Sequence, residues 1–166
     1  MRKRLLLFLF CICFIVTVLL VHPTMAADII ASGTCGQTVY WSLSSDGVLD
    51  IYGTGSMTNY SSYNDMPWYR YGSYIHSVYV WEGVTSIGEK AFYSIGGTFG
   101  NLTSVQFPSS LTTIGSSAFR KCTNLSKLNF SKGLRVIGEH AFQDCSNITR
   151  LYIANGLTTI KLFTLF

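Results

Sequence analysis

The chain has 166 residues, of which 48% are hydrophobic and 12% charged, so it is long enough for one folded domain and too apolar to be disordered. Its formal charge of +4 depends on Arg2, Lys3 and Arg4, without which nine cationic side chains remain against eight acidic ones. A nearly neutral chain lacks the clustered Lys and Arg that phosphate contacts require, so nucleic acid is excluded as the expected partner.

Residues 1–26 read as a signal peptide. Three basic residues precede an apolar run from Leu5 to Val21, and the small-residue stretch 24–27 follows it. The run is shorter than the roughly 20 residues of a spanning helix, which favours cleavage after Ala26 over an uncleaved anchor. We therefore expect a secreted or cell-surface protein, in contact with the membrane only through the leader or through an anchor beyond this sequence.

Residues 27–74 are predicted to form a β-rich N-terminal region. Residues 38–43 alternate between apolar and polar side chains, Ser45-Asp46-Gly47 supplies a turn, and residues 49–51 alternate again. This pattern predicts a β-hairpin. The many aromatic side chains between residues 40 and 74 suit a unit that covers the apolar end of a stack of repeats. We expect the region to be the cap of the segment that follows.

Residues 75–166 contain a repeat. The segments SIGEKAF, TIGSSAF and VIGEHAF occupy 86–92, 113–119 and 136–142. The gap between the segments at 86–92 and 113–119 is longer than the gap between those at 113–119 and 136–142. The extra residues fall in the Gly-rich stretch 93–100, which is expected to be a loop insertion. About four units fit, the last one incomplete. Five apolar columns recur at the shorter spacing: Leu102, Leu125, Ile148; Val105, Leu128, Leu151; Phe107, Phe130, Ile153; Leu111, Leu134, Leu157; Ile114, Ile137, Ile160.

The constant spacing predicts a solenoid. Residues 105–107 and 128–130 alternate as strands do, and a second apolar pair, a turn glycine and a short helical or 3₁₀ segment such as Ala118-Phe119 complete each unit. One unit cannot bury its apolar face alone, so neighbours must stack, with a ladder of short parallel strands on one side. Turn-forming asparagines precede the strands at Asn101, Asn124 and Asn147.

The units resemble the BspA-type leucine-rich repeats, in which a strand, a proline-containing turn and an Ile-Gly-x-x-Ala-Phe segment follow one another. Pro108 in FPSSLTTIGSSAF matches this pattern, and SGTCGQTVYWSLSSDGVLDIYGTGSMTNY with Met66-Pro67-Trp68-Tyr69 is similar to the region that precedes such repeats. The resemblance covers about residues 32–160. It implies a leucine-rich-repeat fold and an exported protein used for adhesion to extracellular macromolecules.

The pattern breaks at its end, where Lys161 to Phe166 follow Ile160 in place of Gly-x-x-Ala-Phe. No C-terminal cap is visible in the sequence. An uncapped apolar coil invites self-association, or the chain is a fragment of a longer protein.

The outward side chains of the strand ladder are the candidate contacts with an extracellular protein or glycan. Tyrosine and arginine are good interface anchors, although a solvated sheet face would show the same pattern. The candidates are Tyr79, Gln106, Lys127, Asn129, Arg150 and Tyr152, with Ser77 and Ser104 on the same strip.

No catalytic, metal or cofactor site is predicted. His76 and His140 have no metal-ligand spacing with a cysteine or with each other, and no triad surrounds either of them. The glycines at 53–55 and 96–97 lack a following Gly-Lys-Ser/Thr and read as turns. Cys122 and Cys145 hold the same place in consecutive units, as buried free thiols or as a disulfide between stacked coils.

Three functions fit this sequence. The first is a protein-binding or adhesion module without catalysis. The second is an N-terminal targeting or spacer domain of a longer secreted enzyme, truncated in this sequence. The third is carbohydrate binding through Trp41, Trp68 and Trp81, which buried packing would explain equally well.

Overall fold

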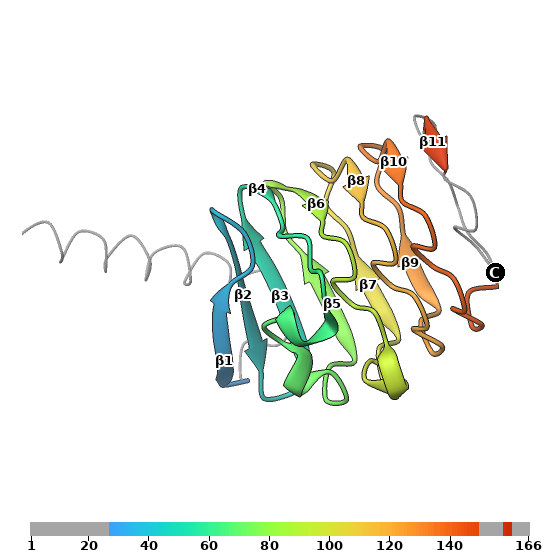
Figure 1. Cartoon of the computed structure of the whole chain (residues 1–166). Coiled ribbons are helices and arrows are strands. Elements are labelled where there is room, and N and C mark those ends of the chain that lie inside the picture. Colours follow the sequence, from blue (N-terminus) through green and yellow to red (C-terminus); the bar gives the residue numbers. More distant parts are fainter. Residues whose placement is uncertain (1–26, 150–157, 161–166) are drawn as a thin grey trace, which may run out of the picture.

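The computed structural model describes residues 27–149 and 158–160, so the expected leader at 1–26 lies outside the described residues. Two sheets run along the molecule (Figure 1). The first contains, in spatial order, β1 (Ile29–Thr34), β2 (Val39–Ser44), β3 (Val48–Gly53), β5 (Ser77–Val80), β7 (Ser104–Gln106) and β9 (Lys127–Asn129). The second contains β4 (Gly55–Ser56), β6 (Val84–Ile87), β8 (Thr113–Ile114), β10 (Val136–Ile137) and β11 (Thr159–Ile160).

The predicted solenoid is confirmed by the register of the strands. In the first sheet Val78 pairs with Val105 and Val105 with Leu128, all in parallel. The second sheet has the same arrangement, with Ile87 opposite Ile114 and Ile114 opposite Ile137. Leu151, which follows Val105 and Leu128 in the repeat, lies outside the described residues. Each coil therefore lies directly on its neighbour, and the evenly spaced columns of the sequence become rows of packed side chains.

An aromatic column fills the centre of the coils. Phe119 stacks between Phe92 and Phe142, with ring centroids 5.0 and 5.3 Å away, and all three side chains are buried. The alanines that precede them, Ala91, Ala118 and Ala141, are fully buried as well. The predicted short helical segment is a single 3₁₀-type turn, in which the N–H of Ala118 donates to the carbonyl of Gly115.

The N-terminal hairpin is also confirmed. Strands β2 and β3 are antiparallel, and the turn between them has Gly47 in the left-handed region at φ 82°. The sequence did not predict β1, which pairs with β2 as the edge of the sheet. It also missed that β3 pairs in parallel with β5 and β4 with β6, so that the hairpin region continues both sheets of the repeats.

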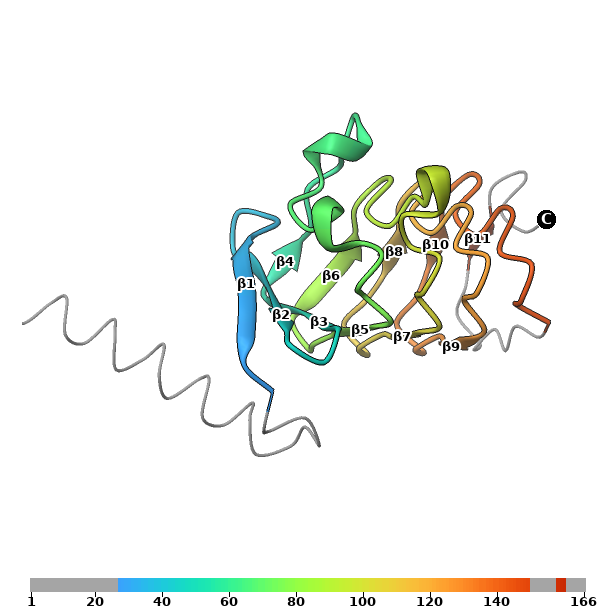
Figure 2. The ribbon, with the colours of Figure 1, turned by 90° about the horizontal axis from the view of Figure 1, so that it is seen from below.

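Trp68 extends the aromatic column into the N-terminal region. Its indole stacks on Phe92 with centroids 5.3 Å apart, and its Nε1 donates to the carbonyl of Ala91. Two 3₁₀ helices, η1 (Tyr63–Asp65) and η2 (Tyr69–Tyr71), flank it. In Figure 2 they lie on the side of the coil opposite the first sheet. Trp68 therefore takes the place that phenylalanine holds in the repeats.

The insertion at 93–100 is more than a solvated loop. It contains the 3₁₀ helix η3 (Ile95–Gly97), and its Phe99 is buried against Phe92 with ring centroids 5.7 Å apart. The inserted residues thus add an aromatic side chain to the core next to the cap.

Candidate binding face

The outward side chains of the first sheet form a continuous surface, here called the ladder face. In parallel and antiparallel pairs alike, residues opposite each other in register point to the same side of the sheet. The pairings define a central row that crosses five strands: Ser42, Asp50, Tyr79, Gln106 and Asn129. A second row beside it crosses β5, β7 and β9: Ser77, Ser104 and Lys127.

Four of the six predicted contact residues lie on this face. Tyr79 is half-buried, whereas Gln106, Lys127 and Asn129 are exposed. Arg150 and Tyr152 lie outside the described residues. The described candidates come from three neighbouring coils, because the repeat places the same strand position side by side. The face can therefore present several side chains at once to one partner.

The sequence analysis missed an aromatic row at the N-terminal end of the face. Tyr40 lies opposite Tyr52, with ring centroids 5.9 Å apart. Trp81 directly follows Val80, which pairs with Ile51, and its N–H donates to the Ile51 carbonyl, so its backbone continues the register opposite Tyr52. Tyr40 is 41% exposed, and Tyr52 and Trp81 are half-buried.

The alternation of residues 38–43 and 49–51 could have placed Tyr40 and Asp50 on the outer side of the hairpin. What the alternation could not reveal is that the hairpin joins the same sheet as the repeats. Only the parallel pairing of β3 with β5 brings Asp50 next to Tyr79.

Two of the tryptophans considered for carbohydrate binding belong to the core. Trp41 is 4% exposed and Trp68 is fully buried, and their rings contact each other edge to face at 5.9 Å. Packing therefore accounts for both, and that part of the carbohydrate hypothesis was wrong. Trp81 differs, because it lies on the ladder face and its Nε1 donates to Oδ1 of Asp50 over 2.8 Å.

Charge is distributed unevenly along the face. Asp50 lies in the central row, and Glu82 directly follows Trp81 in the chain. The carboxylate of Glu82 accepts hydrogen bonds from the N–H groups of Ser109 and Ser110, and the bond from Ser109 lowers the pKa of that carboxyl. Lys127 lies at the other end of the described face. The N-terminal part is thus anionic and aromatic, and the C-terminal part carries a cation.

His76 contacts a serine on the face without forming a catalytic triad. Its Nδ1 lies 2.9 Å from Oγ of Ser77, and its Nε2 contacts the backbone carbonyl of Asp46. In a catalytic triad, the histidine nitrogen that does not face the nucleophile is hydrogen-bonded to a carboxylate, which orients the ring. The carboxylate of Asp46 instead accepts from the hydroxyl of Ser44. These bonds tie the start of β5 to the hairpin turn.

The two repeated cysteines are free thiols in the structure. Sγ of Cys122 donates to the Phe92 carbonyl, and Sγ of Cys145 donates to the Phe119 carbonyl, at 3.1 and 3.0 Å. Burial raises the pKa of Cys145 to about 12 and moves that of Cys122 in the same direction. Each thiol therefore serves as a neutral donor between coils, and the alternative of a disulfide is not what the structure contains.

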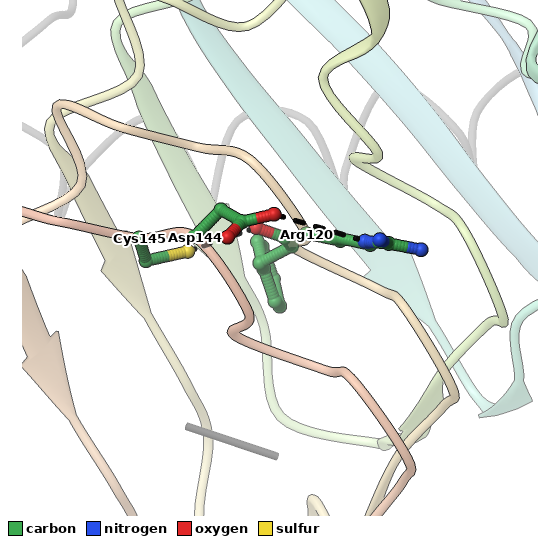
Figure 3. A network of polar contacts seen from close by, with 4 residues as sticks. Arg120, Asp144 and Cys145 are labelled. Atoms are coloured by element: carbon green, nitrogen blue, oxygen red, sulfur yellow. Dashed lines mark hydrogen bonds and ion pairs between the residues drawn. The ribbon is translucent and has the colours of Figure 1, made fainter. Parts of the chain in front are cut away.

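A second polar network lies close to Cys145. Arg120 reaches toward Asp144 of the next coil, with Nε and Oδ2 4.0 Å apart (Figure 3). Its guanidinium also lies over the ring of Tyr93, 5.6 Å from the centroid. Both contacts join consecutive coils. Arg120 and Asp144 therefore have a structural role in holding neighbouring coils together.

Two kinds of feature are absent from the described part of the chain. Among residues 27–149 and 158–160, no group of three or more His, Cys, Asp or Glu side chains is close enough to hold a metal ion. No helix within the same ranges is both long and apolar enough to cross a membrane.

Stacked coils with a ladder of short parallel strands on one side define the class of leucine-rich-repeat solenoids. The model of the BspA type leucine rich repeat region matches residues 68–165 in six copies. Because this match covers more than half of the chain, the chain belongs to the BspA-type leucine-rich repeat family. The resemblance stated from the residues is therefore confirmed.

Solved structures of bacterial proteins are similar. A leucine-rich repeat protein from Eubacterium ventriosum is 35% identical over 65% of this chain and 28% of its own, with a TM-score of 0.55. The T. pallidum leucine rich repeat protein is 25% identical over 75% and 62%, with a TM-score of 0.49. A leucine rich cell surface protein from Faecalibacterium prausnitzii is 21% identical over 71% and 35%, with a TM-score of 0.46.

This chain therefore covers less than two thirds of each of these three proteins. No curated protein matches the chain.

Proposed function

We propose that this protein is a secreted or cell-surface adhesion module that binds an extracellular macromolecule through its ladder face and performs no chemistry of its own. The observation that carries the proposal is the alignment of Tyr79, Gln106 and Asn129 in one row across three coils. Such a row offers a partner repeated contacts on a rigid surface, which lowers the entropic cost of binding. The predicted leader and membership of the BspA-type family support export.

The test is capture of purified extracellular-matrix proteins and cell-surface glycans by the full chain, measured by surface plasmon resonance. A ladder variant carries Tyr79→Ala, Gln106→Ala, Lys127→Ala and Asn129→Ala. A few residues near the centre of an interface carry most of the binding energy, about 2 kcal/mol or more each when truncated, so removing four central side chains together should lower affinity at least about tenfold.

A matched control carries Glu89→Ala and Glu139→Ala, both exposed on the turns away from the ladder face. The control should bind like the wild type, and both variants should keep the wild-type circular dichroism spectrum. Full binding by the ladder variant would reject the face as the contact surface. Failure of the wild type to bind any member of the panel would count against adhesion itself.

A further inference from the structure

A chain of hydrogen bonds runs from the hairpin turn into the second row of the ladder face, which consists of Ser77, Ser104 and Lys127. Nε2 of His76 contacts the backbone carbonyl oxygen of Asp46, and its Nδ1 lies 2.9 Å from Oγ of Ser77. Oγ of Ser77 in turn lies 2.9 Å from Oγ of Ser104. The chain therefore connects an exposed imidazole to the neighbour of Lys127.

The carbonyl at one end fixes the direction of every bond in this chain. A carbonyl oxygen has no hydrogen to give, so Nε2 of His76 is the donor to it, and in the neutral imidazole Nδ1 then carries no proton. Nδ1 accepts the hydroxyl hydrogen of Ser77, and because that hydroxyl has only one hydrogen, Ser104 is the donor to Ser77. The Ser104 oxygen consequently offers only lone pairs to a partner while His76 is neutral.

Protonation of His76 reverses the chain. An imidazolium has hydrogen on both nitrogens, so Nδ1 donates to Ser77 and Ser77 donates to Ser104. The hydroxyl hydrogen of Ser104 is then released to point away from Ser77. Histidine is the side chain whose charge ordinarily changes between about pH 5 and about pH 8. Over this range the row gains a hydrogen-bond donor and a positive charge.

The other ionisable groups around the imidazole come from the hairpin turn and its contacts. Asp46 is in the turn, Asp28 is bonded to the turn through its backbone N–H, and Tyr74 donates its hydroxyl hydrogen to the turn. From the side of β7, the uncharged Thr103 donates to the His76 carbonyl. Carboxyl and phenol groups ordinarily titrate near about pH 4 and about pH 10. A change between about pH 7.5 and about pH 5.5 is therefore assigned to the histidine.

Lys127 supplies the second half of a binding site. It lies opposite Ser104 in register, so the two side chains project from the same side of neighbouring strands, which lie about 4.8 Å apart. The Lys127 side chain is exposed, and no hydrogen bond or ion pair within the described part of the chain engages its ammonium group. A carboxylate has two oxygens, so it can accept from this ammonium group and from the Ser104 hydroxyl together.

We propose that Ser104 and Lys127 bind a carboxylate of the partner protein, and that His76, acting through Ser77, strengthens this contact when it becomes protonated. The inference rests on the proposed adhesion function and adds the chemistry of one contact, an aspartate or glutamate side chain, together with its regulation. At neutral pH the lone pairs of Ser104 oppose the carboxylate, whereas in mild acid Ser104 donates to it. His76 is a positioning residue, because it acts on the ligand through the two serines.

The first measurement needs no ligand. Long-range proton–nitrogen NMR spectra report which nitrogen of an imidazole carries the proton, and the His76→Gln variant identifies the signals of His76 among the three histidines of the chain. At about pH 7.5 the proton should be on Nε2, and toward about pH 5.5 Nδ1 should gain one as well. A neutral ring with its proton on Nδ1 would overturn the inference.

The second measurement uses the full chain and a short peptide with one glutamate, together with the same peptide carrying glutamine in its place. Binding is followed by the backbone amide NMR signals of Ser104 and Lys127. The glutamate peptide, still largely ionised in mild acid, should bind at least about fivefold more tightly at about pH 5.5 than at about pH 7.5. The glutamine peptide should bind more weakly and equally at both.

Two variants and a control separate the relay from its charge. Ser77→Ala interrupts the chain and keeps His76, so the gain in acid should fall below about twofold, the remainder coming from the screened charge alone. Lys127→Gln should lower affinity for the glutamate peptide about fivefold at both pH values. Ser61→Ala changes an exposed serine beside η1, away from the ladder face, and should behave as the wild type does.

Equal affinity of the glutamate peptide at the two pH values, no saturable binding at either, or a full gain in acid by Ser77→Ala would each overturn the inference. These outcomes are separable from failure of the adhesion proposal. If the full chain captures an extracellular protein equally well at both pH values, adhesion stands and the switch falls. If it captures none while the glutamate peptide binds with the expected pH dependence, the carboxylate site stands and adhesion falls.

Discussion

The N-terminal cap (residues 27–74) and the repeat coils (described over residues 75–149) build the same two sheets by different means. In the described coils every strand pairing is parallel, and Phe92, Phe119 and Phe142 stack on one another from coil to coil. The cap has no preceding coil among the described residues, and it closes the stack with the antiparallel strands β1, β2 and β3 and with the larger rings of Trp41 and Trp68. A repeat can rely on its neighbour for burial, whereas a terminal unit has to supply its own covering side chains.

The largest expected effect is the loss of stability when a buried ring is removed from the aromatic column, and it tests whether cap and coils unfold as one cooperative unit. Phe119→Ala in the coils and Trp68→Ala in the cap each remove a fully buried ring from the same column, and each should lower the free energy of unfolding by about 3–5 kcal/mol. Both variants should unfold in a single urea transition by circular dichroism. Trp68→Phe, which keeps a ring and loses the bond to the Ala91 carbonyl, should cost about 1–2 kcal/mol. An early separate transition in Trp68→Ala alone would show that the cap folds independently.

A second prediction concerns the glycines that let each coil approach the one before it. A Cβ at Gly88 would lie 1.9 Å from the carbonyl oxygen of Thr58 in the cap, and one at Gly115 would lie 2.6 Å from the N of Glu89 in the previous coil. Gly88→Ala and Gly115→Ala should each destabilise by about 1–3 kcal/mol, as local backbone strain does. Gly96→Ala, where no atom lies within 4 Å, should cost about 1 kcal/mol through its positive φ alone. Urea denaturation would measure all three, and a loss at Gly88 no greater than at Gly96 would mean that the cap does not pack as a coil does.

Alkaline pH should weaken both regions. Burial raises the pKa of Cys35 in the cap and of Cys145 in the coils from 9.0 to about 12. The folded state then holds these protons more tightly than the unfolded chain, so the contribution to stability is complete below pH 9.0 and is lost as pH rises toward 12. The loss is at most about 1.4 kcal/mol per pH unit for each thiol. Urea midpoints at pH 9.0 and at about pH 10.5 measure it.

Single variants separate the two regions in that experiment. Cys35→Ala and Cys145→Ala should each reduce the steepness of the alkaline loss by a similar amount. If Cys35→Ala has the same pH dependence as the wild type, the cap is more hydrated than the coils.

The smallest expected effect is stabilising and specific to the coils. Lys90, Ser117 and His140 share one place in the Ile-Gly-x-x-Ala-Phe turn and have φ values of 55°, 55° and 57°. Glycine tolerates the left-handed region without the clash of a Cβ, so Ser117→Gly should raise the free energy of unfolding by about 0.5–1 kcal/mol. Thermal denaturation would measure the gain, with Ser126→Gly at an exposed position of ordinary φ as the control. If Ser117→Gly were less stable than the wild type, the backbone at this turn position would not be strained.

The repeats were predictable because their signal is periodic. Val105 and Leu128 hold the same place in consecutive units of the sequence and lie opposite each other in the sheet, so spacing and stacking carry the same information. The cap has no period, and only its hairpin could be predicted, from the turn at Gly47 and the alternation on either side. Strand β1, whose sequence IIASGT has no clear alternation of apolar and polar residues, could not be predicted.

The candidate site divides in the same way. Tyr79, Gln106, Lys127 and Asn129 follow from strand periodicity alone, because an outward position on one coil is outward on the next. Asp50 and Trp81 could not be grouped from the sequence, since they are far apart in the chain and no repeat relates them. Their contact depends on the pairing of β3 with β5.

The sequence by itself determined the coil length, the residues that face the core and the outward strip of the repeats, since all of these follow from local alternation and from one repeated distance. The tertiary structure decided which strands of the cap join the repeat sheet, that Trp68 continues the phenylalanine column, and that an acid and four aromatic rings meet on one face. The physical reason is that register between non-repeated strands is set by side-chain packing between segments far apart in the chain, which no local pattern encodes.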